Sequence, residues 1–200
     1  TPYEILSGLV GSEMCIRDSY TTSYTMTYEH FRQKQRSTFD EDNLIAYAYR
    51  TRKYFVDCTT AIDIGCGIGY QTAKLSRLLP AIKFIMLDKD GDEEPVNYSK
   101  TGYIHNDLSL TTQFAKLNIN GVVYNIDDYK WNDPAEIVYS TLSWGWHYPI
   151  DAYIGQVLQL KPRYIIFDSR KEHRITIPNY KIIDSFRINR KENTLVYSRS

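Results

Sequence analysis

The residues best suited to chemistry are the glycine-rich stretch Asp63–Gly69 (DIGCGIG) and an acid, Asp88, nineteen residues beyond its last glycine. Glycines allow a tight turn and let a ligand approach the backbone without meeting a Cβ atom. An acid at the tip of the following strand can accept hydrogen bonds from both hydroxyls of a ribose. The pair therefore predicts a nucleoside-binding site.

The position of this stretch along the chain supports that interpretation. It lies between a short apolar segment, Thr60–Ile64, typical of a strand, and a helix-like segment, Tyr70–Leu79, which Pro80 ends. A turn that merely uses glycines is the alternative. A dinucleotide fingerprint, G-x-G-x-x-G, would place its third glycine at position 70, where the chain has a tyrosine. The spacing therefore disfavours NAD.

The string Asp63-x-Gly65-x-Gly67-x-Gly69 resembles the D/E-x-G-x-G-x-G motif of class I S-adenosylmethionine-dependent methyltransferases. The resemblance extends in organisation over residues 60–200, although Leu-Lys-Pro-Arg precedes the fifth strand where many members have L-K-P-G-G. It implies S-adenosylmethionine as cofactor, with the first acid near the methionine moiety, Asp88 on the ribose and an acid after the third strand on the adenine amine. The cofactor-binding residues we expect are Asp63, Gly65, Cys66, Gly67, Gly69, Asp88, Lys89, Asp127, Asp128 and Ser140.

A second candidate segment, Ser140–Pro149 (STLSWGWHYP), follows the fourth predicted strand. In open α/β sheets ligands bind outside the carboxyl ends of the strands, so this segment is expected where donor and acceptor meet. Trp144, Trp146 and Tyr148 can form planar walls for an acceptor, and His147 can remove a proton from a hydroxyl. We expect His147, Trp144 and Tyr148 as catalytic residues. The alternative is that the tryptophans cover the sheet edge and His147 is an ordinary loop histidine.

The elements that must position these residues alternate between strand-like and helix-like patterns. Such an alternation, closed by two strands too near in sequence for a helical crossover, predicts an α/β fold. We expect a doubly wound, mostly parallel seven-stranded sheet with a C-terminal antiparallel hairpin. The predicted helices are 40–55, 70–79, 108–117 and 150–160, and the predicted strands are 60–64, 83–87, 121–126, 136–140, 163–168, 180–187 and 194–198.

Composition narrows the function classes. The chain has 200 residues, 24 Lys plus Arg and 24 Asp plus Glu, so it has no global basic field, and duplex DNA is an unlikely partner. The longest apolar run, Leu44–Tyr49, is far shorter than the roughly 20 residues of a membrane span. Three cysteines without CxxC spacing fit a cytoplasmic protein. His30, His105 and His173 lack metal-ligand spacing, and we expect no metal site.

The N-terminal residues 1–19 resemble a translated sequencing-adapter string (MCIRDS) of the kind found in metagenomic assemblies, and we expect an artefact or a disordered tail there. Residues 20–59 are then expected to form a helical extension and residues 60–200 the cofactor-binding domain.

The expected activity is methyl transfer to a small-molecule acceptor, with an oxygen acceptor preferred because of His147. No N-P-P-Y motif, which would indicate amino methylation, follows the fourth predicted strand. Two alternatives stay open: a non-catalytic nucleoside-binding or scaffold protein of the same fold, and an RNA methyltransferase. The acceptor and the oligomeric state are not predicted.

Overall fold

The inner strands of the protein are apolar on both faces, as strands of a covered parallel sheet are. In β1 (Thr60–Ile64) the last four residues are buried, and in β4 (Ile137–Ser140) all four are. The computed structural model describes residues 41–90, 107–147, 149–170, 175–187 and 192–200. The remaining strands are β2 (Lys83–Asp88), β3 (Gly121–Asn125), β5 (Tyr164–Arg170), β6 (Tyr180–Arg187) and β7 (Glu192–Arg199).

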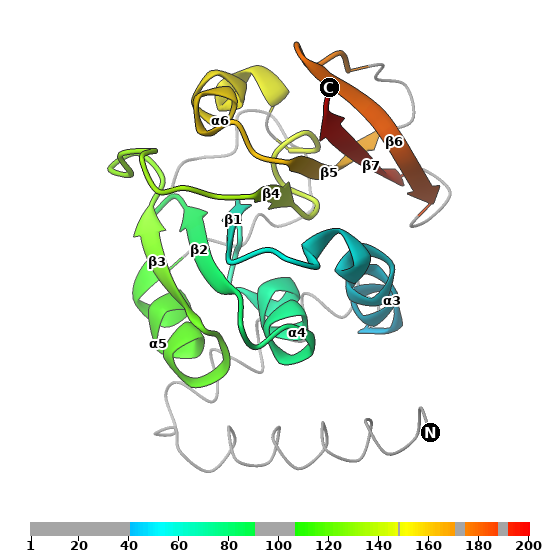
Figure 1. The fold of residues 1–200 in the computed structure, drawn as a ribbon. Helices are drawn as coiled ribbons and strands as arrows, with labels where there is room; N and C mark the ends of the chain where they lie inside the picture. The colour runs from blue at the N-terminus through cyan, green and yellow to red at the C-terminus, as the bar shows by residue number, and fades with distance from the viewer. Residues whose placement is uncertain (1–40, 91–106, 148, 171–174, 188–191) are drawn as a thin grey trace, which may run out of the picture. The chain divides into compact units, whose positions relative to one another are not determined.

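All seven strands form one sheet in the order β3-β2-β1-β4-β5-β7-β6 (Figure 1). The strands from β3 to β5 pair in parallel, whereas β7 pairs antiparallel with both β5 and β6. The predicted fold class is therefore confirmed: an α/β protein with a mostly parallel seven-stranded sheet and an antiparallel C-terminal hairpin. The strand order reverses between β1 and β4, and ligands of open α/β sheets bind at such a switch point.

The helices differ from the predicted ones mainly at two breaks. The predicted first helix is an α-helix followed by a 3₁₀ turn, and the predicted helix 150–160 is interrupted at Tyr153, which has φ −133° and ψ −1°. Figure 1 shows α4 and α5 on one side of the sheet and α6 on the other. The helical elements are α3 (Glu41–Thr51), η1 (Arg52–Phe55), α4 (Tyr70–Leu78), α5 (Leu108–Asn118), η2 (Ile150–Ala152) and α6 (Ile154–Leu160).

One face of the sheet packs against α6 and the β3–β4 loop. Val157 of α6 and Tyr129 and Ala135 of that loop join a single apolar cluster with side chains of β1, β2, β4, β5 and β7. The β3–β4 connection, residues 126–136, contains no helix, so loop side chains cover the sheet there. Its aromatic residues therefore do the packing that a crossover helix usually does.

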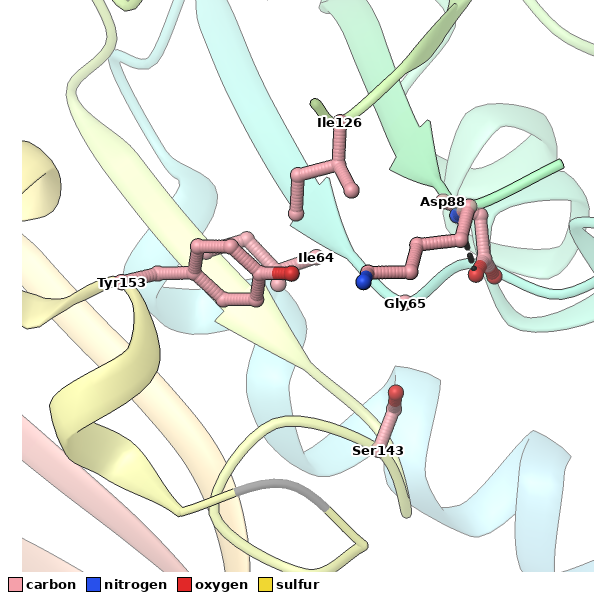
Figure 2. Close-up of a pocket in the computed structure, with 7 residues that line it drawn as sticks. Ile64, Gly65, Asp88, Ile126, Ser143 and Tyr153 are labelled. Atoms are coloured by element: carbon pink, nitrogen blue, oxygen red, sulfur yellow. Dashed lines mark hydrogen bonds between the residues drawn. The ribbon is translucent and has the colours of Figure 1, made fainter. Parts of the chain in front are cut away.

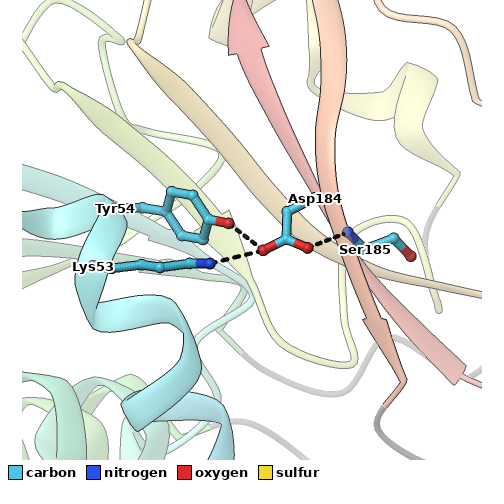
Figure 3. Close-up of polar contacts among 4 residues, drawn as sticks. All are labelled: Lys53, Tyr54, Asp184 and Ser185. Carbon is cyan, nitrogen blue, oxygen red and sulfur yellow. Dashed lines mark hydrogen bonds and ion pairs between the residues drawn. The ribbon is translucent and has the colours of Figure 1, made fainter.

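The opposite face is covered by α3, η1, α4 and α5. Tyr139 of β4 makes edge contacts with Phe55 and Phe84, at ring-centroid distances of 5.6 and 6.4 Å. The η1 turn is also tied to the C-terminal hairpin, where Asp184 accepts hydrogen bonds from Lys53 Nζ, at 3.0 Å, and from the Tyr54 hydroxyl (Figure 3). These contacts fix α3 and η1 over strands that lie far from them in the sequence.

Several expectations fall on residues that the structure does not describe. The N-terminal stretch Thr1–Ser19, residues 20–40 of the expected helical extension and the proposed catalytic Tyr148 all lie outside the described residues. His30, His105 and His173, for which no metal site was expected, lie outside them as well. Among the helices that the structure describes, none has the length and apolar character needed to cross a bilayer.

Candidate functional site

The glycine-rich stretch forms the turn between β1 and α4. Gly65, Gly67 and Gly69 have φ values of +70°, +55° and +94°, a region that favours glycine because it has no Cβ atom. The backbone N–H groups of Gly65 and Cys66 both donate to the carbonyl of Leu87, at 2.7 and 3.2 Å. The loop is thereby anchored to the end of β2.

The three glycines differ in how closely other atoms surround them. A Cβ at Gly65 would stand 1.8 Å from Ser143 Oγ, and one at Gly69 would stand 2.4 Å from Met86 Cε. A Cβ at Gly67 would meet no described atom within 4 Å. Gly65 and Gly69 are therefore closely packed, whereas no atom of the described residues crowds Gly67.

Asp88 connects β2 to this loop. Its Oδ2 accepts a hydrogen bond from Gly67 N at 2.6 Å, and its Oδ1 accepts one from Lys89 N at 2.8 Å. The sequence predicted that Asp88 lies beside the glycines, and the structure places it there. A carboxylate has about four acceptor positions, so one that orders the loop can also accept ribose hydroxyls.

A pocket opens at this end of the sheet, between the glycine loop, the end of β2 and the start of α6 (Figure 2). Figure 2 shows the ring of Tyr153 pointing into it from the α6 side, with Ser143 below and Ile126 above. Three of the expected cofactor-binding residues line it: Gly65, Asp88 and Lys89. The other lining residues are Ile64, Ile126, Ser143 and Tyr153.

Asp63 does not line this pocket. It is 2% exposed and lies on the opposite face of β1, where it accepts a hydrogen bond from the Thr72 hydroxyl of α4. Thr72 Oγ1 lies 2.9 Å from the Tyr139 hydroxyl, which completes a buried polar chain. Burial raises the pKa of Asp63 to about 7, and the negative charge of Asp88 adds to the rise while the Thr72 hydrogen bond opposes it. Asp63 thus holds α4 against the sheet from below the loop.

The two acids after β3 differ from Asp88 in exposure. Asp127 and Asp128 are both exposed, and Asp127 Oδ2 lies 3.8 Å from Lys89 Nζ in an ion pair. Ile126, just before them, donates its backbone N–H to Asp88 O at 2.9 Å. The ends of β2 and β3 are therefore joined at the pocket, and Asp127 is at its rim.

Cys66 and Ser140 make internal contacts in this structure. Burial raises the pKa of the Cys66 thiol well above its ordinary value, and Sγ donates to Gly67 O at 3.4 Å. Ser140 is fully buried; its hydroxyl donates to Ile64 O at 2.7 Å and accepts from Trp144 N at 2.8 Å. Neither side chain is among those that line the pocket, and Ser140 instead joins the end of β1 to the loop after β4.

Trp144 is not placed as an acceptor-pocket wall requires. It is completely buried, its indole N–H donates to Ile150 O at 3.0 Å, and its ring packs against Phe167. A ring without accessible surface cannot stack on a substrate, so the structure corrects this expectation. The sequence-based alternative, in which the tryptophan covers the sheet, describes Trp144 correctly.

His147 lies one turn beyond the pocket residue Ser143. Its backbone N–H donates to Ser143 O at 2.7 Å. The residue is half-buried, its Nδ1 atom is buried, and its imidazole makes an edge contact with the ring of Trp146. The turn contains Gly145, whose φ of +88° and close approach to Phe167 require glycine. His147 is therefore near the pocket without lining it, and its catalytic role remains a proposal.

Four pocket residues were not singled out from the sequence. Ser143 belongs to the segment expected to meet the substrate, and Ile64 and Ile126 end or follow strands, so strand-end positions were an available signal. No sequence signal marked Tyr153, because the sequence predicts that it lies inside a continuous helix. Its position depends on the break between η2 and α6. No group of three or more His, Cys, Asp or Glu side chains suited to a metal ion occurs in the described part of the chain.

No protein-family model matches the chain, and no curated protein matches it. Solved structures do match. A hypothetical protein of Thermus thermophilus has 9% sequence identity and a TM-score of 0.53, with 80% of this chain and 86% of that chain covered. The N-terminal domain of EvdMO1, solved in the presence of SAH and D-fucose, has 12% identity and a TM-score of 0.51, with coverages of 81% and 84%.

The 16S rRNA methylase ArmA has 14% identity and a TM-score of 0.51, with 80% of this chain and 83% of that chain covered. By contrast, the chain spans about half the length of the plantazolicin methyltransferase BpumL, 52%, at 17% identity and a TM-score of 0.49. Identities this low establish a shared fold and nothing more specific. The fold is thus one that methyltransferases also have.

Proposed function

We propose that this protein is an S-adenosylmethionine-dependent methyltransferase that acts on a small-molecule acceptor, with an oxygen atom as the preferred acceptor. The observation that carries the proposal is the pairing of the glycine loop with Asp88 at the carboxyl edge of β1 and β2. Neighbours of the same fold, EvdMO1 solved with SAH and the rRNA methylase ArmA, support the class.

The pocket residues suit the donor's nucleoside. Asp88 is positioned to accept ribose hydroxyls, and Ile64 and Ile126 supply apolar surface for the adenine ring. Gly67 does not line the pocket, but no described atom crowds it, so a ligand can approach the backbone there. Asp127, at the rim, can accept from the adenine amine once Lys89 turns away from it. Asp63, Cys66 and Ser140 would then act indirectly, by fixing the loops around the donor.

The donor, when bound, supplies an activated methyl group, and the protein's own task is chiefly alignment and exclusion of water. The loop after β4 helps to exclude water, because hydrogen bonds of Ser140 and Trp144 hold its first turn against the sheet. With the donor bound, the acceptor oxygen would take the methyl group and S-adenosylhomocysteine would be released. His147 is the residue proposed to take the acceptor proton.

A small-molecule acceptor fits the charge of the chain better than RNA does. Lys plus Arg and Asp plus Glu are equal at 24, and nucleic-acid binding depends on neutralising phosphates. The RNA methylase ArmA shares the fold, so RNA remains the second candidate. A non-catalytic nucleoside-binding protein is the third, and binding without turnover would identify it.

The donor site is tested by calorimetry with S-adenosylhomocysteine. Asp88→Ala should weaken binding by about 1.5–3 kcal/mol, the range for hydrogen bonds to a charged partner. Asp151→Ala, which removes an exposed acid of η2, is the matched control and should leave affinity unchanged. Binding of NADH without binding of S-adenosylhomocysteine would overturn the proposal.

The proposed base is tested on the enzyme with an identified acceptor. If the acceptor must lose a proton, His147→Ala should lower turnover by roughly 10²–10⁴-fold while S-adenosylhomocysteine affinity stays nearly intact. Because a protonated imidazole cannot accept a proton, turnover should rise with pH between about pH 5 and 8 if a histidine is the base. Flat kinetics over that range, with an unimpaired variant, would leave alignment as the whole mechanism.

A further inference from the structure

Four aromatic side chains form a continuous row that starts in the pocket and follows the β3–β4 loop. Tyr153 stacks on Trp131, with ring centroids 6.0 Å apart and an interplanar angle of 24°. Trp131 makes an edge contact with Tyr129 at 5.3 Å, and Tyr129 packs on Tyr124 at 5.5 Å. We call Tyr153, Trp131, Tyr129 and Tyr124 the aromatic row. It joins the pocket to the outer strand β3.

Trp131 is held in an unfavourable backbone conformation. Its φ of +50° lies in the left-handed region, which bulky residues rarely adopt, and such conformations cluster at binding and active sites. A loop that only needed to turn there would be better served by glycine. The conformation instead places an indole against Tyr153, which lines the pocket.

The row is accessible over much of its length. Tyr124 is 44% exposed, and Trp131 and Tyr153 are partly exposed. Tyr129 is mostly buried, and its hydroxyl donates to Asp133 Oδ2 at 3.0 Å, which fixes the middle of the row. Aromatic surface is therefore available both at the pocket and outside it.

The β3–β4 loop has a net negative charge, although Lys89 of the pocket pairs with one of its acids, Asp127. Between residues 127 and 133 the loop has three acids, Asp127, Asp128 and Asp133, and one base, Lys130. Such a loop repels the phosphates of a nucleic acid. Aromatic faces with nearby carboxylates instead attract planar cations, by cation–π and Coulomb interactions together.

We propose that the aromatic row binds a planar ring of the methyl acceptor, and that the preferred ring is cationic or uncharged rather than anionic. This rests on the proposed function, since it names the acceptor's chemistry for the same site. The donor's nucleoside is held on the glycine-loop side by Asp88, and the row forms the opposite wall, beginning at Tyr153.

The test uses N-methylacridinium as a planar cationic probe, with its affinity for the full chain measured by equilibrium dialysis. Trp131→Gly removes the indole and relieves the positive φ, and thermal melting measures how far this relief offsets the lost packing of the indole on the core cluster. Its affinity for the probe should fall about tenfold, the size of a stacking or cation–π contact. Trp131→Phe should retain most of the affinity, and acridine-9-carboxylate, a planar anion, should bind the parent chain at least about tenfold more weakly.

Several results would overturn the proposal. Unchanged probe affinity in Trp131→Gly would show that the row is only packing. Competition between S-adenosylhomocysteine and the probe would assign the row to the donor, and indole-dependent binding of a single-stranded oligonucleotide would assign it to nucleic acid. Failure of the proposed function is a separate result: the parent chain would not bind S-adenosylhomocysteine, while the dialysis experiment would still report on the row.

Discussion

The loops after β1 and after β4 lie at the same edge of the sheet but are built in opposite ways. The loop after β1 is shaped by the backbone, with three glycines in left-handed conformations and open space beside Gly67. The loop after β4 is shaped by packing, because Trp144 is completely buried and Ser140 bonds both to the end of β1 and to Trp144. The first loop is thus free to contact a ligand, whereas the second supports the pocket mainly from within.

The largest effect should come from Trp144→Ala. Removing a fully buried tryptophan costs about 3–5 kcal/mol of stability, and here it also removes the hydrogen bond from the indole to Ile150. Urea unfolding followed by circular dichroism measures the loss. Trp146→Ala is the matched control, since that tryptophan is partly exposed and should cost much less.

An opposite outcome would reverse the comparison of the two loops. If Trp144→Ala unfolds at nearly the same urea concentration as the parent chain but loses methyl transfer, the residue contacts the acceptor in a conformation different from the one described. Packing would then not be what fixes the loop after β4.

The second prediction is that alanine substitutions at two glycines of the loop after β1 have different effects. Gly65→Ala must adopt φ +70° and also displaces Ser143, so it should lose more than the roughly 1–2 kcal/mol that the left-handed conformation alone costs. Gly67→Ala should lose only that backbone cost, because its methyl group meets no described atom. The methyl would stand in the proposed ligand space, however, and should weaken S-adenosylhomocysteine binding.

Unfolding and calorimetry on the same two variants separate these effects. Equal losses of stability would mean that Ser143 moves aside at little cost. Unimpaired S-adenosylhomocysteine binding by Gly67→Ala would mean that the donor does not approach the loop at this glycine.

This contrast also explains what the sequence could reveal. The glycine loop was predictable because a positive φ is a local demand that only a few residue types meet. The strands and their succession along the chain were predictable from apolar runs and the α/β alternation. Asp88 was predictable from its spacing to the glycines, and the structure places it beside Gly67.

Features that depend on tertiary packing were not predictable. Trp144 is buried through its contacts with the Phe167 ring and the Ile150 carbonyl. No local sequence pattern predicts these contacts. The break at Tyr153 turns a predicted helical residue into a pocket residue, and the helical periodicity of 150–160 gives no sign of it. Asp63 matched the motif, yet the alternation of β1 directs its side chain to the face opposite the pocket.

The last prediction concerns Asp63 and pH. Its pKa is about 7 in the folded protein, against an ordinary value of 3.8, so the folded chain holds a proton that the unfolded chain has lost between those values. Stability should therefore decrease as pH rises from about 4 to 7, by at most about 1.4 kcal/mol per pH unit for one proton, and level off above 7. Asp63→Asn, which keeps an oxygen acceptor for Thr72, should remove this slope.

Asp184→Asn provides a control of opposite sign. The hydrogen bonds from Tyr54 and Lys53 lower the pKa of Asp184, so its contribution is present above its unfolded pKa and disappears as the pH falls through its folded pKa. Urea unfolding at a series of pH values should show Asp63→Asn flattening the curve between pH 4 and 7 while Asp184→Asn alters only the acid limb. If Asp63→Asn does not change how stability decreases between pH 4 and 7, Asp63 is ionised in the folded protein at neutral pH. The buried chain through Thr72 and Tyr139 would then stabilise a carboxylate beneath the loop, and the negative charge so close to Asp88 would favour a donor that carries positive charge.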